Sequence, residues 1–163
     1  MNPVYDVATI NGKMLGSGDP VKVKQGERVM IHILNSSPTE VHWISVSGHS
    51  FKVVALDGNP VAQTQTVSMI RLAPAERVSA IVEMNNPGVW VLGEVRRHVQ
   101  ASGMGVVIEY ANSSGKPVWT QPGNLVWNYR QFAGASDVVQ YQDVKVIELA
   151  FDSKFQGHGN EEL

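Results

Sequence analysis

Residues 88–110 read GVWVLGEVRRHVQASGMGVVIEY, and this stretch decides the fold that the sequence predicts. Residues 89–95 and 104–110 are rich in valine and other apolar residues, which is typical of β-strands. The polar stretch 97–102 between them is the one helical candidate, and Gly103-Met104-Gly105 forms a corner. The stretch therefore predicts a strand, a short crossover and a second strand.

Further runs with strand-like alternation lie on the N-terminal side, separated by turns rich in Gly, Pro, Asn and Asp. They are residues 4–10, 20–24, 28–34, 41–46, 51–56, 64–72 and 77–84. Both faces of 28–34 are apolar, which predicts a strand in the middle of a sheet. Short strands at this spacing, without a sustained helical period, predict an all-β sandwich.

The composition changes after residue 111. Residues 112–117 (NSSGKP) are a linker signal, yet the following residues are rich in aromatic side chains, which favour burial. We therefore predict a β-domain at 1–111 and, at 112–142, an aromatic-rich extended arm laid over a surface. Residues 143–151 are strand-like again. We expect 143–163 to open a following domain that this chain does not include.

Composition excludes several classes of function. The net charge of −2, without a basic run carrying interleaved aromatics, argues against a nucleic-acid or anionic-membrane partner. Apolar runs are shorter than a membrane span, and residues 1–12 do not resemble a signal peptide. The chain has no cysteine, which excludes disulfides, zinc–thiolate sites, cysteine nucleophiles and thiolate-ligated blue copper. The sequence leaves open whether the chain forms an oligomer.

Four stretches carry a resemblance to a known family. They are 5–13 (YDVATINGK), 48–58 (GHSFKVVALDG), 72–77 (LAPAER), and PGVW at 87–90 together with GMG at 103–105. Residues 5–111 resemble a cupredoxin domain of the multicopper oxidases, in particular the non-copper-binding middle domain of a three-domain, laccase-like oxidase. Residues 147–154 resemble the first strand of the domain that follows it.

The resemblance implies a Greek-key, cupredoxin-like β-sandwich in a periplasmic or secreted oxidoreductase. It implies copper in the parent protein and no cofactor in this domain. Neighbouring cupredoxin domains of the same protein would be the partners, docked through the aromatic arm and the final strand. The isolated domain would be inactive as an enzyme.

The same resemblance locates vestigial type 1 copper positions. The two imidazoles, the thiolate and the axial Met of such a site fall on His42, Val99, Glu94 and Met104. The histidine positions of the three-copper cluster fall on Ser45, Ser47, Gly93 and Val95. A type 1 site requires a thiolate, so these residues predict neither a metal site nor catalytic or cofactor-binding residues in this domain.

Alternation along the strands leaves two alternatives for Glu94. It shares a face with Trp90 and Leu92, and if that face is inward the carboxylate must be paired, since an isolated buried carboxylate is costly. We predict either a Glu94–His42 pair in the copper position or a solvated Glu94 at an exposed strand end. His42 is then a hydrogen-bonded core histidine or a residual ligand. Residues 96–98 (RRH) are interpreted as a solvated crossover.

Three functions remain open. The preferred interpretation is a structural cupredoxin domain that scaffolds the catalytic domains of a multicopper oxidase-like protein. The alternatives are a protein- or carbohydrate-binding β-sandwich module, and a divergent copper-binding electron-transfer domain using His42, His98 or Met104.

Overall fold

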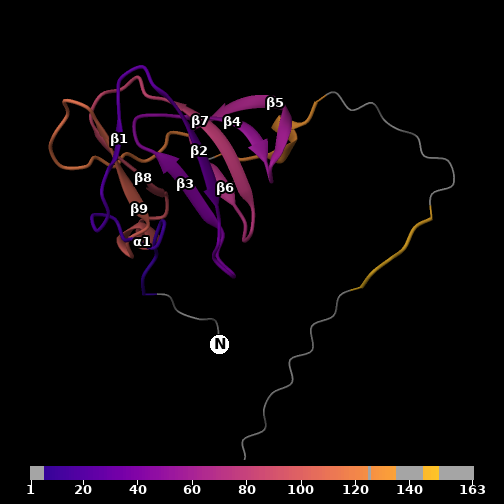
Figure 1. Ribbon diagram of the computed structural model, residues 1–163. Coiled ribbons are helices and arrows are strands. Elements are labelled where there is room, and N and C mark those ends of the chain that lie inside the picture. The colour runs from indigo at the N-terminus through magenta and orange to yellow at the C-terminus, as the bar shows by residue number, and fades with distance from the viewer. Residues whose placement is uncertain (1–5, 125, 135–144, 151–163) are drawn as a thin grey trace, which may run out of the picture.

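The computed structural model describes residues 6–124, 126–134 and 145–150, most of which belong to a β-sandwich (Figure 1). The strands are β1 (Val21–Val23), β2 (Arg28–Leu34), β3 (His42–Val46), β4 (Phe51–Leu56), β5 (Asn59–Val67), β6 (Ile70–Leu72), β7 (Arg77–Glu83), β8 (Val89–Glu94) and β9 (Gly105–Tyr110). The helices are the short α1 (Arg97–Ala101) and the 3-10 helix η1 (Tyr129–Phe132). This confirms the predicted all-β fold and the helical crossover. No helix among the described residues has the length and apolar character needed to cross a membrane.

Two sheets enclose the core. One has the order β1-β9-β8-β3-β6 and the other has the order β2-β7-β4-β5, so consecutive strands repeatedly cross between layers, as in a Greek key. Alternation places Val78, Ala80 and Val82 of β7 inside the sandwich, where they join Phe51 and Val53 of β4. In the five-stranded sheet, β8 lies between β9 and β3 and is antiparallel to both. The stretch that decided the predicted fold therefore supplies the centre of this sheet.

Strand β2 is an end strand, so the prediction of a central strand was wrong. Among the described residues it pairs with β7 alone. Val29, Ile31 and Ile33 pack against the core and are half-buried, whereas Met30 and Leu34 are 47% and 57% exposed. The prediction took apolar residues on both faces as a sign of a strand in the middle of a sheet. The outward face of β2 is instead exposed to solvent.

Two other predicted strands also differ from the structure. The run 64–72 is interrupted, since β5 ends at Val67 in one sheet and β6 begins at Ile70 in the other. Of the run 4–10, residues 6–10 form only a single bridge, from Ile10 to Lys13 across the Asn11-Gly12 turn, and residues 4–5 lie outside the described residues. The alternation of side chains in the sequence did not indicate where these two runs are interrupted.

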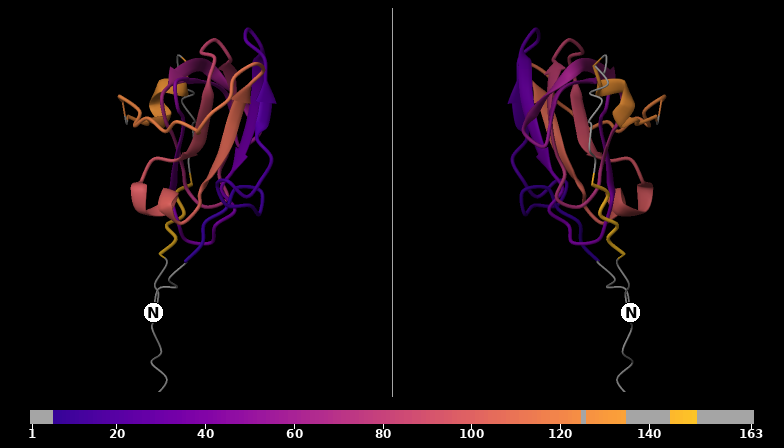
Figure 2. Two further views of the ribbon diagram at one scale, coloured as in Figure 1. Left: turned by 90° about the vertical axis from the view of Figure 1, so that its left-hand side faces the viewer. Right: turned by 90° about the vertical axis from the view of Figure 1, so that its right-hand side faces the viewer.

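The described part of the arm lies on the sandwich itself. Val118 bridges to β8, where the Val91 N–H donates to the Val118 carbonyl at 3.0 Å and the Val118 N–H donates to the Val89 carbonyl at 2.8 Å. The arm then crosses towards β5, as both views in Figure 2 show. There Phe132 is buried, with its ring 5.1 Å from that of Trp127. Phe132 is thus buried and Trp127 half-buried against the sandwich of this chain.

The last described segment makes no strand. Residues 145–150 have no strand assignment, and Val146, Ile147 and Leu149 are 84%, 69% and 72% exposed. The remainder of the predicted strand 143–151 and the tail to residue 163 lie outside the described residues. A strand needs a neighbour to pair its backbone groups, and the described residues provide none for this segment.

Candidate functional site

His42 and Glu94 are brought together by the pairing of two central strands. Glu94 is the last residue of β8 and lies opposite Ile44 of β3, so His42 is its diagonal neighbour on the same face. That face is inward. Glu94 is fully buried and His42 is 7% exposed. Of the two alternatives left open for Glu94, the inward orientation is therefore the one observed, and a solvated Glu94 is wrong.

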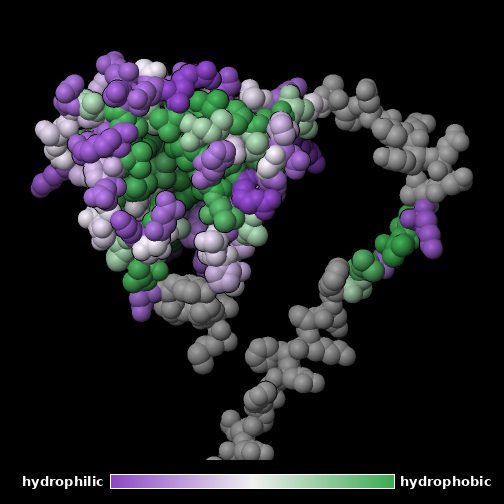
Figure 3. All heavy atoms as spheres, viewed as in Figure 1, coloured by the Kyte–Doolittle hydropathy of each residue, from purple (hydrophilic) through white to green (hydrophobic). Residues whose placement is uncertain are grey.

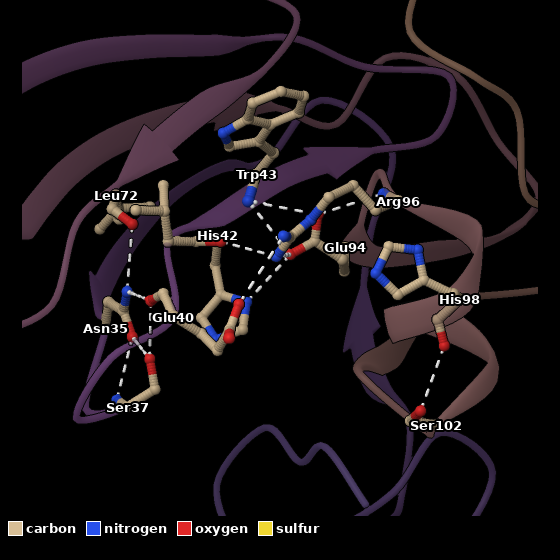
Figure 4. Close-up of polar contacts among 11 residues, drawn as sticks. Asn35, Ser37, Glu40, His42, Trp43, Leu72, Glu94, Arg96, His98 and Ser102 are labelled. Carbon is tan, nitrogen blue, oxygen red and sulfur yellow. Dashed lines mark hydrogen bonds and ion pairs between the residues drawn. The ribbon is translucent and has the colours of Figure 1, made fainter. Parts of the chain in front are cut away.

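The predicted pair forms, as Figure 4 shows. His42 Nδ1 lies 3.0 Å from Glu94 Oε2. The Trp43 backbone N–H shares its hydrogen with both carboxylate oxygens, at 3.3 and 3.2 Å. An ionised carboxylate can only accept hydrogen bonds, so the His42 contact requires the proton on Nδ1. The two β3 residues thus satisfy one side of the carboxylate.

Arg96 satisfies the other side, and sequence reasoning missed it. Its Nε lies 3.2 Å from Glu94 Oε1, its Nη2 lies 3.2 Å from Oε2, and its backbone N–H donates to Oε1 at 3.1 Å. This is the two-pronged geometry that a guanidinium favours with a carboxylate. Nη2 also donates to the Val41 carbonyl at 2.6 Å, and the guanidinium carbon lies 5.9 Å from the centre of the Trp43 ring. The interpretation of residue 96 as part of a solvated crossover was wrong.

A signal for Arg96 was present in the sequence. Arg96 follows Glu94 by two residues, and residues at that spacing share a face when a strand continues. Strand β8 ends at Glu94, and residues 95 and 96 form a bend before α1 begins, with Arg96 itself in an extended conformation. The side chain therefore returns over Glu94 rather than pointing to solvent.

The pKa of Glu94 is set by opposing effects. Burial by itself raises it, because a charge is disfavoured away from water. The hydrogen bonds from His42, Arg96 and Trp43 outweigh burial and hold the pKa below its usual value. Glu94 is therefore ionised at neutral pH, and the position is filled by a carboxylate that already has partners on both oxygens.

The remaining predicted type 1 positions, Val99 and Met104, lie in α1 and in the corner before β9. Met104 precedes β9, is half-buried against the core, and accepts a hydrogen bond from the Glu94 backbone N–H at 3.2 Å through its carbonyl. Val99 is half-buried in α1, which packs against β8. His98 is exposed on α1, and its carbonyl accepts a hydrogen bond from Ser102 Oγ at 3.1 Å.

The positions that resemble cluster ligands form a second group on the same strands. Ser45 of β3 lies directly opposite Gly93 of β8. A Cβ at Gly93 would meet the Met104 carbonyl oxygen at 2.6 Å, so no side chain fits there without a backbone shift. Ser47 is buried beneath the arm, where its Oγ accepts a hydrogen bond from the Thr120 N–H at 3.0 Å. Val95 is buried and carries no ligating atom.

Two of the other histidines have structural partners. His49 donates from Nδ1 to the Ser47 carbonyl at 2.8 Å, and its Nε2 lies 2.6 Å from the Tyr110 hydroxyl. The His49 ring also stacks on Tyr110. His32 Nδ1 lies 2.8 Å from Ser79 Oγ on the paired strand β7. Among the described residues, no three His, Asp or Glu side chains are grouped so that they could hold a metal.

A polar cavity of about 670 Å³ lies where the arm crosses the β3–β4 corner. Its lining includes Ser45, His49, Lys52, Thr66 and Thr120. The buried Ser45 Oγ has no hydrogen-bond partner among the described residues. The cavity lining includes none of the side chains of the Glu94 network.

Comparisons with known proteins agree with this architecture. The family model described as multicopper oxidase matches residues 1–110. Multicopper oxidase MmcO of Mycobacterium tuberculosis is 30% identical over 63% of this chain, and Laccase-3 of Thanatephorus cucumeris is 37% identical over 49% of it. The chain covers 19% and 16% of these two relatives, so it spans about a fifth of their length.

Solved structures show the same fold. A blue copper oxidase from Nitrosomonas europaea is 28% identical, with a TM-score of 0.59, over 66% of this chain and 35% of its own. The multicopper oxidase mgLAC is 24% identical, with a TM-score of 0.62, over 79% of this chain and 40% of its own. The sandwich is therefore cupredoxin-like, as predicted.

Proposed function

Because the chain belongs to the multicopper oxidase family, we propose that it is a copper-free cupredoxin domain that holds the copper-bearing domains of a larger oxidase in position. The observation that carries the proposal is the environment of Glu94. Both carboxylate oxygens are taken by Arg96, His42 and the Trp43 backbone. An ion pair thus stands where the resemblance expects a thiolate and its metal.

The residues present do not fit a type 1 copper. Such a site needs a thiolate, and the chain has no cysteine. His42 carries its proton on Nδ1, where it contacts the ionised Glu94, so only Nε2 could ligate a metal, and no thiolate accompanies it. Gly93 leaves no room for a cluster histidine beside Met104. From the chemistry of these residues, we therefore propose that this domain lacks the ligands of a type 1 copper and of the three-copper cluster.

The wider role follows from the family. Copper would be held by other domains of the parent protein, which would be the oxidoreductase, and this chain alone would turn over no phenol or ferrous iron. Its partners would be neighbouring cupredoxin domains, met through the arm and residues 143–163. The parent would be periplasmic or secreted, as the resemblance implies.

Copper titration tests the proposal. We expect the wild-type chain to take up no stoichiometric copper and to show neither a blue absorption band nor the electron-spin signal of type 1 copper. The double variant Glu94→Cys/Val99→His supplies the missing ligand types beside His42 and Met104, and we expect it to gain the blue band. Stoichiometric copper uptake by the wild-type chain that His42→Ala abolishes would overturn the proposal.

A further inference from the structure

Strand β2 presents an open edge beside an exposed apolar surface. Among the described residues β2 pairs with β7 alone, so the backbone groups on its other side have no strand partner. Its sequence RVMIHIL contains neither the proline nor the lysine that often protects an edge strand, and Met30 and Leu34 are about half exposed. In Figure 3, hydrophobic residues gather at the centre of the side of the molecule on which Figure 1 labels β2. Such an edge is a template for a further strand.

The same chain contains a segment that needs such a template. Residues 145–150 read KVIELA and pair with no strand in the part of the chain that the structure describes, with Val146, Ile147 and Leu149 largely exposed. Ile147 and Leu149 lie on one face of an extended chain, and Val146 and Glu148 lie on the other. One face is therefore suited to a sandwich interior and the other carries a charge suited to the surface.

We propose that two copies of this chain join by strand addition, with residues 145–150 of one copy pairing along β2 of the other. Ile147 and Leu149 turn inward beside the half-buried residues of β2, and Glu148 lies on the outer face that also carries Arg28 and His32. The exchange is reciprocal about a two-fold axis, so each copy gives one strand and receives one.

A second copy is the occupant that the structure favours. Among the residues that the structure describes, neither the outer edge of β2 nor residues 145–150 have a strand partner, and one exchange provides a partner for both. The opposite charges of Glu148 and Arg28 are compatible with neighbouring positions on the outer face. The inference rests on the proposed function in that residues 143–163 act as a docking segment in both, and it adds a second copy of the chain as the unit to which residues 145–150 dock.

Cysteine cross-linking tests the arrangement cleanly, because the chain has no cysteine of its own. One sample carries Met30→Cys on the outer face of β2. The others each carry a single cysteine at Val146, Ile147, Glu148 or Leu149. After mixing and mild oxidation, we expect high yields of mixed dimer for positions 146 and 148 and several-fold lower yields for 147 and 149. Equal yields at all four positions, or no mixed dimer, would refute the strand addition.

Light scattering on a sizing column measures the assembly directly. We expect the wild-type chain to be a dimer and Ile147→Asp to weaken dimerisation at least tenfold. Val126→Asp is the matched control, since Val126 is 64% exposed on the arm and Ile147 is 69% exposed, and this variant should remain dimeric. A monomeric wild type, or a dimer indifferent to Ile147→Asp, overturns this inference and leaves the copper-free function untouched. Copper uptake by the wild-type chain would overturn the copper-free function and leave the inferred dimer untouched.

Discussion

Replacing Glu94 by Gln removes the charge from the buried network while keeping the shape of the side chain. The carboxylate accepts from His42, from the Trp43 N–H and from three groups of Arg96. A glutamine has one accepting oxygen, and its NH₂ group would face the donors of Arg96 or His42. The variant therefore leaves a guanidinium without its main partner.

The size of the loss follows from how well the remaining charge reaches solvent. Breaking a buried ion pair by removing one partner costs about 3–5 kcal/mol. The Arg96 side chain is 26% exposed and its Nη1 lies 3.9 Å from Glu40 Oε2, so water and Glu40 compensate part of the charge. We therefore expect a loss at the lower end, about 3 kcal/mol in the free energy of unfolding.

Urea unfolding at pH 7, followed by tryptophan fluorescence, measures this loss. Glu83→Gln is the control, because Glu83 and its partner Arg28 are both exposed and 4.0 Å apart, and we expect a change within about 0.5 kcal/mol. Glu94→Gln combined with Arg96→Met should cost less than the sum of the two single variants, since the partners act together. A loss below about 1 kcal/mol for Glu94→Gln would refute the assignment of a buried, fully paired carboxylate.

Two further predictions concern pH and the arm. The folded-state pKa of Glu94 is depressed, so the contribution of its carboxylate to the free energy of unfolding is present above the ordinary pKa of 4.5 and is lost as the pH falls through the folded-state pKa. In urea titrations, the difference in stability between wild type and Glu94→Gln should therefore narrow below about pH 4.5. A difference that stays constant in acid would contradict the depressed pKa. Phe132 in the arm is 4% exposed, so Phe132→Ala should lower the free energy of unfolding by about 3 kcal/mol. Val126→Ala, at an exposed position of the arm, should change it by no more than about 0.5 kcal/mol. Equally small effects of the two variants would show that the arm is not anchored.

The Glu94–His42 pair was within reach of sequence reasoning for a local reason. Side chains alternate along a strand, so Glu94 shares a face with Trp90 and Leu92, and His42 shares one with Ile44. The structure places both faces inward and adjacent through the Ile44–Glu94 pairing. Arg96 was missed because its role depends on where the chain turns after β8. A stretch of two arginines and a histidine before a short helix is otherwise typical of a solvated surface.

Sheet membership was harder to predict than strand positions. Residues 28–34 were correctly predicted as a strand, but their apolar outer face led to the wrong position in the sheet. Alternation along one strand reports its two faces and carries no information about its two edges. The break at Ser68 and Met69 was missed for a related reason, because a strand can change sheets without a Gly or Pro signal.

By itself, the sequence determined that this chain is built from short alternating strands, that it resembles a cupredoxin, and that it has no thiolate for a type 1 copper. These are properties of local pattern and composition, which each residue carries wherever it lies. Only the tertiary structure decided that Arg96 closes the network around Glu94 and that, within the described residues, β2 is an end strand with exposed Met30 and Leu34. Both depend on contacts between residues far apart in the chain or beyond a turn, because burial and pairing are set by neighbours in space.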